Sequence, residues 1–154
     1  MANKSIIYIG VSLIAVITVM TYLSQNNTAA PLIDARNAEM VQTGKELYFY
    51  HCSECHGKNL EGETPNWREF KEDGTLPAPP HDETGHTWHH DDQILFDYTK
   101  KGGAAMVPKG FTSAMPGYGK ILTDLEIRSI LSYIKSTWPQ EIQDKQSQRN
   151  RHDA

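Results

Sequence analysis

The only two cysteines of this chain stand three positions apart and are followed directly by a histidine. The segment Cys52-Ser53-Glu54-Cys55-His56 has the pattern C-x-x-C-H, which is the signature of c-type haem attachment. In that chemistry the two thiols add to the two vinyl groups of haem as thioethers, and the histidine supplies an imidazole nitrogen to the iron. The pattern therefore predicts a chain that folds around one covalently bound haem, held through Cys52, Cys55 and His56.

Two other uses of a C-x-x-C pair fit the sequence less well. A thioredoxin-like redox dithiol follows a strand in a βαβ unit, whereas a helical pattern precedes Cys52 and no parallel sheet follows it. A structural zinc site needs a second pair of ligands at suitable spacing, and the chain has no further cysteine. Haem attachment is therefore the favoured interpretation.

Three main helices are expected, and the first leads straight into the motif. From Ala38 onward, residues at spacings of three and four form one helical face that runs to Cys52. A second helix begins near Asp91 or Asp92, with acidic residues in its first turn, and Gly102 lies just beyond its last turn.

The third helix has the clearest boundaries. Thr123-x-x-Glu126 is a capping box, and Leu122 and Ile127 occupy the two positions of a hydrophobic staple. An apolar stripe continues until Pro139, which ends the helix.

Long irregular segments separate these helices, and no segment has a convincing strand pattern. Residues 57–87 are dominated by Gly, Pro, Asn, Asp and Glu. A loop of this length is expected only where something besides the chain holds it, such as a large cofactor. We therefore predict an all-α, haem-packed domain with long loops over residues 38–139. The tail, 140–154, is polar and has no apolar stripe, so it is predicted to be disordered.

The N-terminal segment, 1–30, differs from the polar remainder. Ile6 to Leu23 is a run of 18 residues without a charge, which is long enough for one apolar transmembrane helix. That length favours a retained anchor with a linker, and a signal segment cleaved near Thr28-Ala29-Ala30 is the alternative. Lys4 and the terminal amine place the N-terminus inside. We expect a single-pass protein of the cell inner membrane with its C-terminal domain on the periplasmic side, or a periplasmic protein after cleavage.

A second axial ligand for the iron is expected from a methionine after the motif. Met106 and Met115 are the two methionines that follow His56. Met115 opens the rigid, turn-rich stretch Met115-Pro116-Gly117-Tyr118-Gly119, directly before the capped helix, whereas Met106 has no such turn chemistry around it. Met115 is therefore the predicted ligand, and Met106 is predicted to be a core gap-filler.

Together these motifs resemble the class I, mitochondrial-type cytochrome c family in a proteobacterial, single-haem form. The resemblance covers roughly Glu39 to Pro139, and its specific parts are the cysteine motif and the Met115-Pro116 pair. It implies a cytochrome c-like fold, one haem c, and an iron bound by His56 and Met115.

Weaker parts of the resemblance lie on the first and last helices of that domain. Gly44 and Tyr48 match the family's small and aromatic positions before the motif. Ile130 and Tyr133 match the positions against which these residues pack.

The resemblance also implies that the axial histidine donates its other ring N–H to the backbone carbonyl of a proline, which fixes the orientation of the imidazole. Pro79 and Pro80 are both candidates, because the insert after His56 is longer than in the mitochondrial form.

Four histidines within ten residues form an unusual cluster: His81, His86, His89 and His90. Such a cluster is able to bind copper or zinc. No spacing, however, places three of the four on one rigid element, so a polar loop that enters a helix, with Asp91 or His90 as its cap, is the favoured interpretation.

Charge and ligation together define the expected function. A formal net charge of −4 excludes a nucleic-acid footprint. An iron with both axial positions filled has no open site for oxygen or peroxide chemistry. The sequence therefore predicts a single-electron carrier, not an enzyme, with redox proteins as donor and acceptor and no small-molecule substrate. The alternative is the electron-transfer subunit of a periplasmic oxidoreductase complex, and a gas sensor or peroxidase requires that Met115 does not bind the iron tightly.

Overall fold

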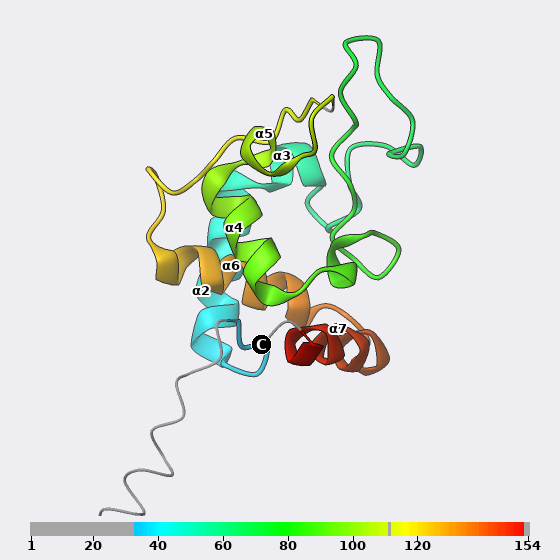
Figure 1. Cartoon of the computed structure of the whole chain (residues 1–154). Coiled ribbons are helices and arrows are strands. Elements are labelled where there is room, and N and C mark those ends of the chain that lie inside the picture. The colour runs from blue at the N-terminus through cyan, green and yellow to red at the C-terminus, as the bar shows by residue number, and fades with distance from the viewer. Residues whose placement is uncertain (1–32, 111, 153–154) are drawn as a thin grey trace, which may run out of the picture. The chain divides into compact units, whose positions relative to one another are not determined.

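The computed structural model describes residues 33–110 and 112–152. The elements in chain order are α2 (Ala38–His51), α3 (Ser53–His56), the 3-10 helix η1 (Thr87–His89), α4 (Asp92–Lys101), α5 (Gly103–Met106), α6 (Asp124–Ser136) and α7 (Gln140–His152) (Figure 1). Within the described residues the one strand-like pairing is a single bridge between Thr75 and Thr112. The predicted all-α class is therefore confirmed.

The predicted apolar helix, Ile6 to Leu23, lies outside the described residues. Among the helices that are described, none combines the length and the apolar character that crossing a bilayer requires.

The three predicted helices begin where their capping residues place them. Asn37 accepts a hydrogen bond from the backbone N–H of Met40 at the start of α2 (3.1 Å). Asp91 does the same for Ile94 at the start of α4 (2.8 Å), so it is the cap and Asp92 is the first helical residue. The capping box before α6 is complete, with both of its reciprocal bonds formed.

The core lies where α2 crosses α6. Gly44 of α2 packs so closely on the backbone of Ser129 that a Cβ atom at this position would collide with the Ser129 carbonyl. One turn further along α2, the buried ring of Tyr48 lies 5.6 Å from the ring of Tyr133. The small and aromatic positions expected on α2 therefore pack against α6 as predicted.

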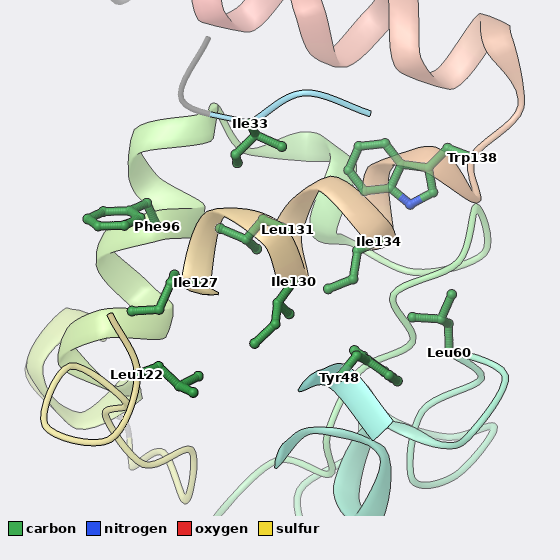
Figure 2. Packing of buried hydrophobic residues seen from close by; sticks show 10 residues of the cluster. All are labelled: Ile33, Tyr48, Leu60, Phe96, Leu122, Ile127, Ile130, Leu131, Ile134 and Trp138. Atoms are coloured by element: carbon green, nitrogen blue, oxygen red, sulfur yellow. The ribbon is translucent and has the colours of Figure 1, made fainter. Parts of the chain in front are cut away.

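Ten buried apolar side chains form one cluster around this crossing, with α6 at its centre (Figure 2). They are Ile33, Tyr48, Leu60, Phe96, Leu122, Ile127, Ile130, Leu131, Ile134 and Trp138. Both staple residues before and within α6, Leu122 and Ile127, belong to the cluster, so the staple joins the helix start to the core.

The long loop between α3 and η1 projects from the helices and returns to them (Figure 1). Backbone hydrogen bonds tie its two limbs together, from Glu63 N to Ala78 O (2.9 Å) and from His81 N to Leu60 O (2.7 Å). Leu60 itself is buried in the core. The loop therefore has internal restraints of its own, which the sequence pattern did not reveal.

The predicted disorder of the tail is wrong for its described part, because Gln140–His152 forms helix α7. Its fully buried Gln146 donates to the Asp92 carboxylate (2.7 Å) and to the His90 carbonyl (3.2 Å). Asn150, one turn later, donates to the same carboxylate (2.9 Å) and accepts from the Asp92 backbone N–H (2.8 Å). A helix docked through polar contacts lacks an apolar stripe, and this is why periodicity failed to predict it.

Candidate functional site

The cysteine motif forms a tight turn at the end of α2. Cys52 ends this helix, and its carbonyl accepts hydrogen bonds from the backbone N–H groups of Cys55 (3.2 Å) and His56 (2.9 Å). This turn carries a half-buried Cys52, an exposed Cys55 and a buried His56 on one short segment. The three motif residues therefore lie within one turn of the chain, and no disulfide links the two cysteines.

The thiol of Cys52 is not activated as a nucleophile. Burial, and to a smaller extent the neighbouring Cys55, raises the pKa of Cys52 to about 12. Redox dithiols instead have a thiol whose pKa is depressed well below 8. The local electrostatics therefore argue against a thioredoxin-like function for this C-x-x-C pair.

His56 has one ring nitrogen committed to a protein partner. Its Nδ1 lies 2.8 Å from the backbone carbonyl oxygen of Pro79. Because a carbonyl only accepts, Nδ1 carries the proton and donates it, so the neutral ring keeps its free lone pair at Nε2. Burial lowers the pKa of His56, and the bond to Pro79 opposes this only in part. Of the two candidate prolines, Pro79 is the one whose carbonyl accepts this hydrogen bond.

The hydroxyl of Tyr48 makes hydrogen bonds to the backbone at the end of the motif. Its hydroxyl lies 3.0 Å from the carbonyl of Gly57 and 3.3 Å from that of His56. Burial raises the pKa of Tyr48, so the hydroxyl stays protonated and donates at neutral pH. The aromatic position of α2 therefore connects the core to the carbonyl end of the motif.

Met115 lies half-buried on the loop between α5 and α6. Its carbonyl accepts from the backbone N–H of Gly103 (3.0 Å), and the N–H of Tyr118 bonds to the Thr99 carbonyl (3.0 Å). The hydroxyl of Tyr118 then donates to the His51 carbonyl at 2.6 Å. Through Tyr118, the methionine loop is fixed to the residue directly before Cys52.

Close backbone packing also holds this loop. Gly102 has φ +86°, and a Cβ atom there would come within 2.6 Å of the backbone nitrogen of Gly117. Both glycines are therefore required for the methionine loop to lie against the end of α4. Met106, by contrast, ends the short helix α5.

The structure adds His81 to the surroundings of His56. The two imidazole rings are stacked, with centroids 4.0 Å apart and planes inclined by 22°. Burial, followed by the proximity of His56, lowers the pKa of His81 well below its ordinary value. The sequence placed His81 in a polar histidine cluster, and no pattern in the sequence shows that His81, and not another member, would stack on His56.

The remaining histidines of the cluster lie apart from the motif. Nε2 of His90 is 3.0 Å from Nε2 of His86, and the His86 ring stacks on that of His89 with centroids 5.0 Å apart. In the part of the chain that the structure describes, no three His, Cys, Asp or Glu side chains are grouped so that they could hold a metal ion. This finding applies to the histidine cluster and equally to Cys52, Cys55 and His56.

The donor set fits a covalently held haem better than a bare ion. Two thiols and an imidazole that do not converge on one point are unsuited to tetrahedral zinc, but a haem needs the thiols at its edge and the imidazole at its centre. The lone pair left at Nε2 of His56 suits an iron ligand. The residues of the motif are therefore those that would hold the haem.

Comparison with known proteins identifies the class. The family model for cytochrome c matches residues 41–138. This match spans well over half of the chain, and it includes both the motif and the methionine loop. The chain belongs to the cytochrome c family. Membership implies covalent haem c, haem-based electron transfer and redox proteins as partners, and such proteins are typically electron carriers, not enzymes.

Among solved structures, the chain is similar to cytochrome cL from the marine methylotrophic bacterium Methylophaga aminisulfidivorans. The two are 23% identical with a TM-score of 0.49, and the match covers 79% of this chain and 68% of the other. This likeness is too distant to support a functional argument. A comparison with curated protein sequences finds no match.

Proposed function

We propose that this protein is a single-haem electron carrier of the class I type, with haem linked to Cys52 and Cys55 and the iron bound by Nε2 of His56 and the sulfur of Met115. The hydrogen bond from Nδ1 of His56 to the Pro79 carbonyl carries this proposal. It holds the proton at Nδ1, so that in the neutral ring, which burial favours, Nε2 is available to a metal.

Met115 is favoured as the second ligand because its loop is fixed in place by contacts with other elements. The carbonyl of Met115 and the hydroxyl of Tyr118 both make hydrogen bonds that tie the loop to other elements. A thioether is a weak ligand, so a loop that is already ordered reduces the entropic cost of binding it.

When bound, haem supplies the one-electron couple between ferrous and ferric iron. Cys52, Cys55, His56 and Met115 would hold and orient the haem, and the burial of His56 would keep water from its ring. With both His56 and Met115 bound, the iron would have no free place for oxygen or peroxide to react. Transfer of single electrons between docked proteins is the activity that remains, and such docking is transient and small in area.

For the location, we propose a single-pass inner-membrane protein with its haem domain in the periplasm. The uncharged run from Ile6 to Leu23 supports an anchor. The test is to fractionate cells that express the whole chain: haem-stained protein in the membrane fraction supports the anchor, and haem-stained protein released with the periplasm favours cleavage.

The ligand assignment is tested by comparing Met115→Ala with its matched control, Met106→Ala. Met115→Ala should open the iron, so that the reduced protein binds carbon monoxide and the reduction potential falls. Met106→Ala should behave as the wild type in both measurements. Carbon monoxide binding by Met106→Ala but not by Met115→Ala would transfer the ligand role to Met106.

A further inference from the structure

Both the backbone and the ring of His81 make hydrogen bonds to buried parts of the protein. Its backbone N–H donates to the Leu60 carbonyl (2.7 Å), and its own carbonyl accepts from the indole Nε1–H of Trp138 (2.7 Å). Its ring Nδ1 lies 2.7 Å from the hydroxyl of Thr87. Leu60, Thr87 and Trp138 are all buried, so backbone and ring are fixed together.

The ring that is fixed in this way faces two aromatic neighbours. It stacks on the imidazole of His56, at 4.0 Å and 22°. It also meets the ring of Tyr48 edge-on, with centroids 6.2 Å apart and planes at 73°. Tyr48 in turn bonds to the carbonyl of His56. His81 therefore packs against the motif's histidine and against Tyr48, whose hydroxyl bonds to the carbonyl of that histidine.

Stacking restrains a motion that the hydrogen bond to Pro79 leaves free. A single bond along the Nδ1–H direction fixes the position of that nitrogen, but it allows the imidazole plane to rock about the line of the bond. A flat ring in contact with the face of His56 opposes this rocking through many dispersion contacts. The hydrogen bond and the stack together define the plane of the ring.

We propose that His81 is a positioning residue that fixes the plane of the His56 imidazole and thereby tunes the haem iron. This inference rests on the proposed function, in which His56 is an axial ligand. The plane of an axial imidazole determines how its orbitals overlap with those of the iron, and outer groups that orient a ligand tune the metal.

The test compares two substitutions in the haem-loaded protein. His81→Leu fills similar space without a flat ring, and His81→Phe keeps a flat ring. Proton NMR of the ferric form measures the paramagnetic shifts of the four haem methyl groups, which report the imidazole plane, and a redox titration measures the potential. His81→Leu should change the spread of the methyl shifts and move the potential, whereas His81→Phe should recover most of the wild-type pattern. His86→Leu, in an exposed position of the same loop, should leave both unchanged.

A second variant keeps the proposal testable if His81→Leu does not fold. Thr87→Val removes the hydroxyl partner of the His81 ring but leaves the ring in place, so the methyl shifts should move in the same direction as in His81→Leu, by less. Two results would overturn the role of His81 in protein that still has covalent haem and a low-spin spectrum. One is that His81→Leu has the methyl shifts and the potential of the wild type. The other is that His81→Leu and His81→Phe depart from the wild type by the same amount. Different results would contradict the proposed function itself. These are wild-type protein without covalent haem, or an unchanged absorption spectrum in His56→Ala.

Discussion

At the residue scale, two tyrosine hydroxyls hold the backbone carbonyls at either end of the motif. Tyr48 is 1% exposed, and its hydroxyl serves the carbonyls at the end of the motif. Tyr118 serves the carbonyl of His51 just before the motif. Two phenol groups from distant parts of the sequence thus bracket the five residues that carry the chemistry, one from the core and one from the methionine loop.

Tyr48→Phe should lower the free energy of unfolding by about 1 kcal/mol, because the substitution removes a hydrogen bond and keeps the ring. Urea unfolding of the haem-loaded protein measures the change. Tyr50→Phe is the matched control, since Tyr50 is 79% exposed on the same helix and should change stability by less than about 0.5 kcal/mol. Equal effects at the two positions would contradict the role given to the Tyr48 hydroxyl.

At the element scale, the helices pack in two different ways. The α2–α6 crossing is apolar and close, whereas α7 is held by a polar network around Asp92. Lys135 of α6 completes this network, with its Nζ 3.4 Å from the Asp92 carboxylate and both side chains almost fully buried. Since Asp92 opens α4, one carboxylate connects three helices.

Asp92→Ala should destabilise the protein by about 3–5 kcal/mol, because it leaves the buried ammonium of Lys135 without its partner. The same variant should release α7, which limited proteolysis detects as early cleavage after Pro139. Asp97→Ala removes a more exposed ion pair, with Lys101, and should cost no more than about 0.5 kcal/mol. An intact α7 in Asp92→Ala would show that the network does not hold this helix.

The capping box of α6 predicts a pH dependence. The backbone N–H of Thr123, and then its hydroxyl, lowers the pKa of Glu126. A carboxyl whose pKa is lower in the folded state stabilises the fold above its unfolded pKa, which is about 4.3 for Glu. That stabilisation is lost as the pH falls through the lower, folded pKa.

Glu126→Gln keeps a side chain that suits the capping box but does not titrate. Wild type should therefore be more stable than Glu126→Gln at neutral pH, and the gap should close on acidification through the folded pKa of Glu126. Thermal melts at a series of pH values measure this gap. A gap that stays constant with pH would mean that the charge of Glu126 contributes nothing.

At the scale of the whole molecule, the sequence predicted the parts whose signals are local. The motif, the cap at Thr123 and the all-α class follow from spacing and from helix-end chemistry, and the same chemistry left Asp91 and His90 as the candidate caps of α4. The family's Gly44 and Tyr48 positions pack as the resemblance implied.

What the sequence did not predict depends on contacts between distant residues. The stack of His81 on His56 joins the returning limb of the long loop to the end of α3, and α7 docks through amide and carboxylate groups that have no periodic signature. The choice of Pro79 over Pro80 also required the path of that loop. Each of these features is decided by tertiary packing, which overrides local pattern.

The most direct test is whether haem stays on the chain after unfolding. Whole protein from a host that matures c-type cytochromes is run on a denaturing gel, stained for haem and weighed by mass spectrometry, with Cys52→Ala/Cys55→Ala as the control. We expect a stained band and a mass gain of one haem in the wild type, and neither in the control. A colourless, folded wild-type protein whose Cys52 and Cys55 both react as free thiols would contradict it.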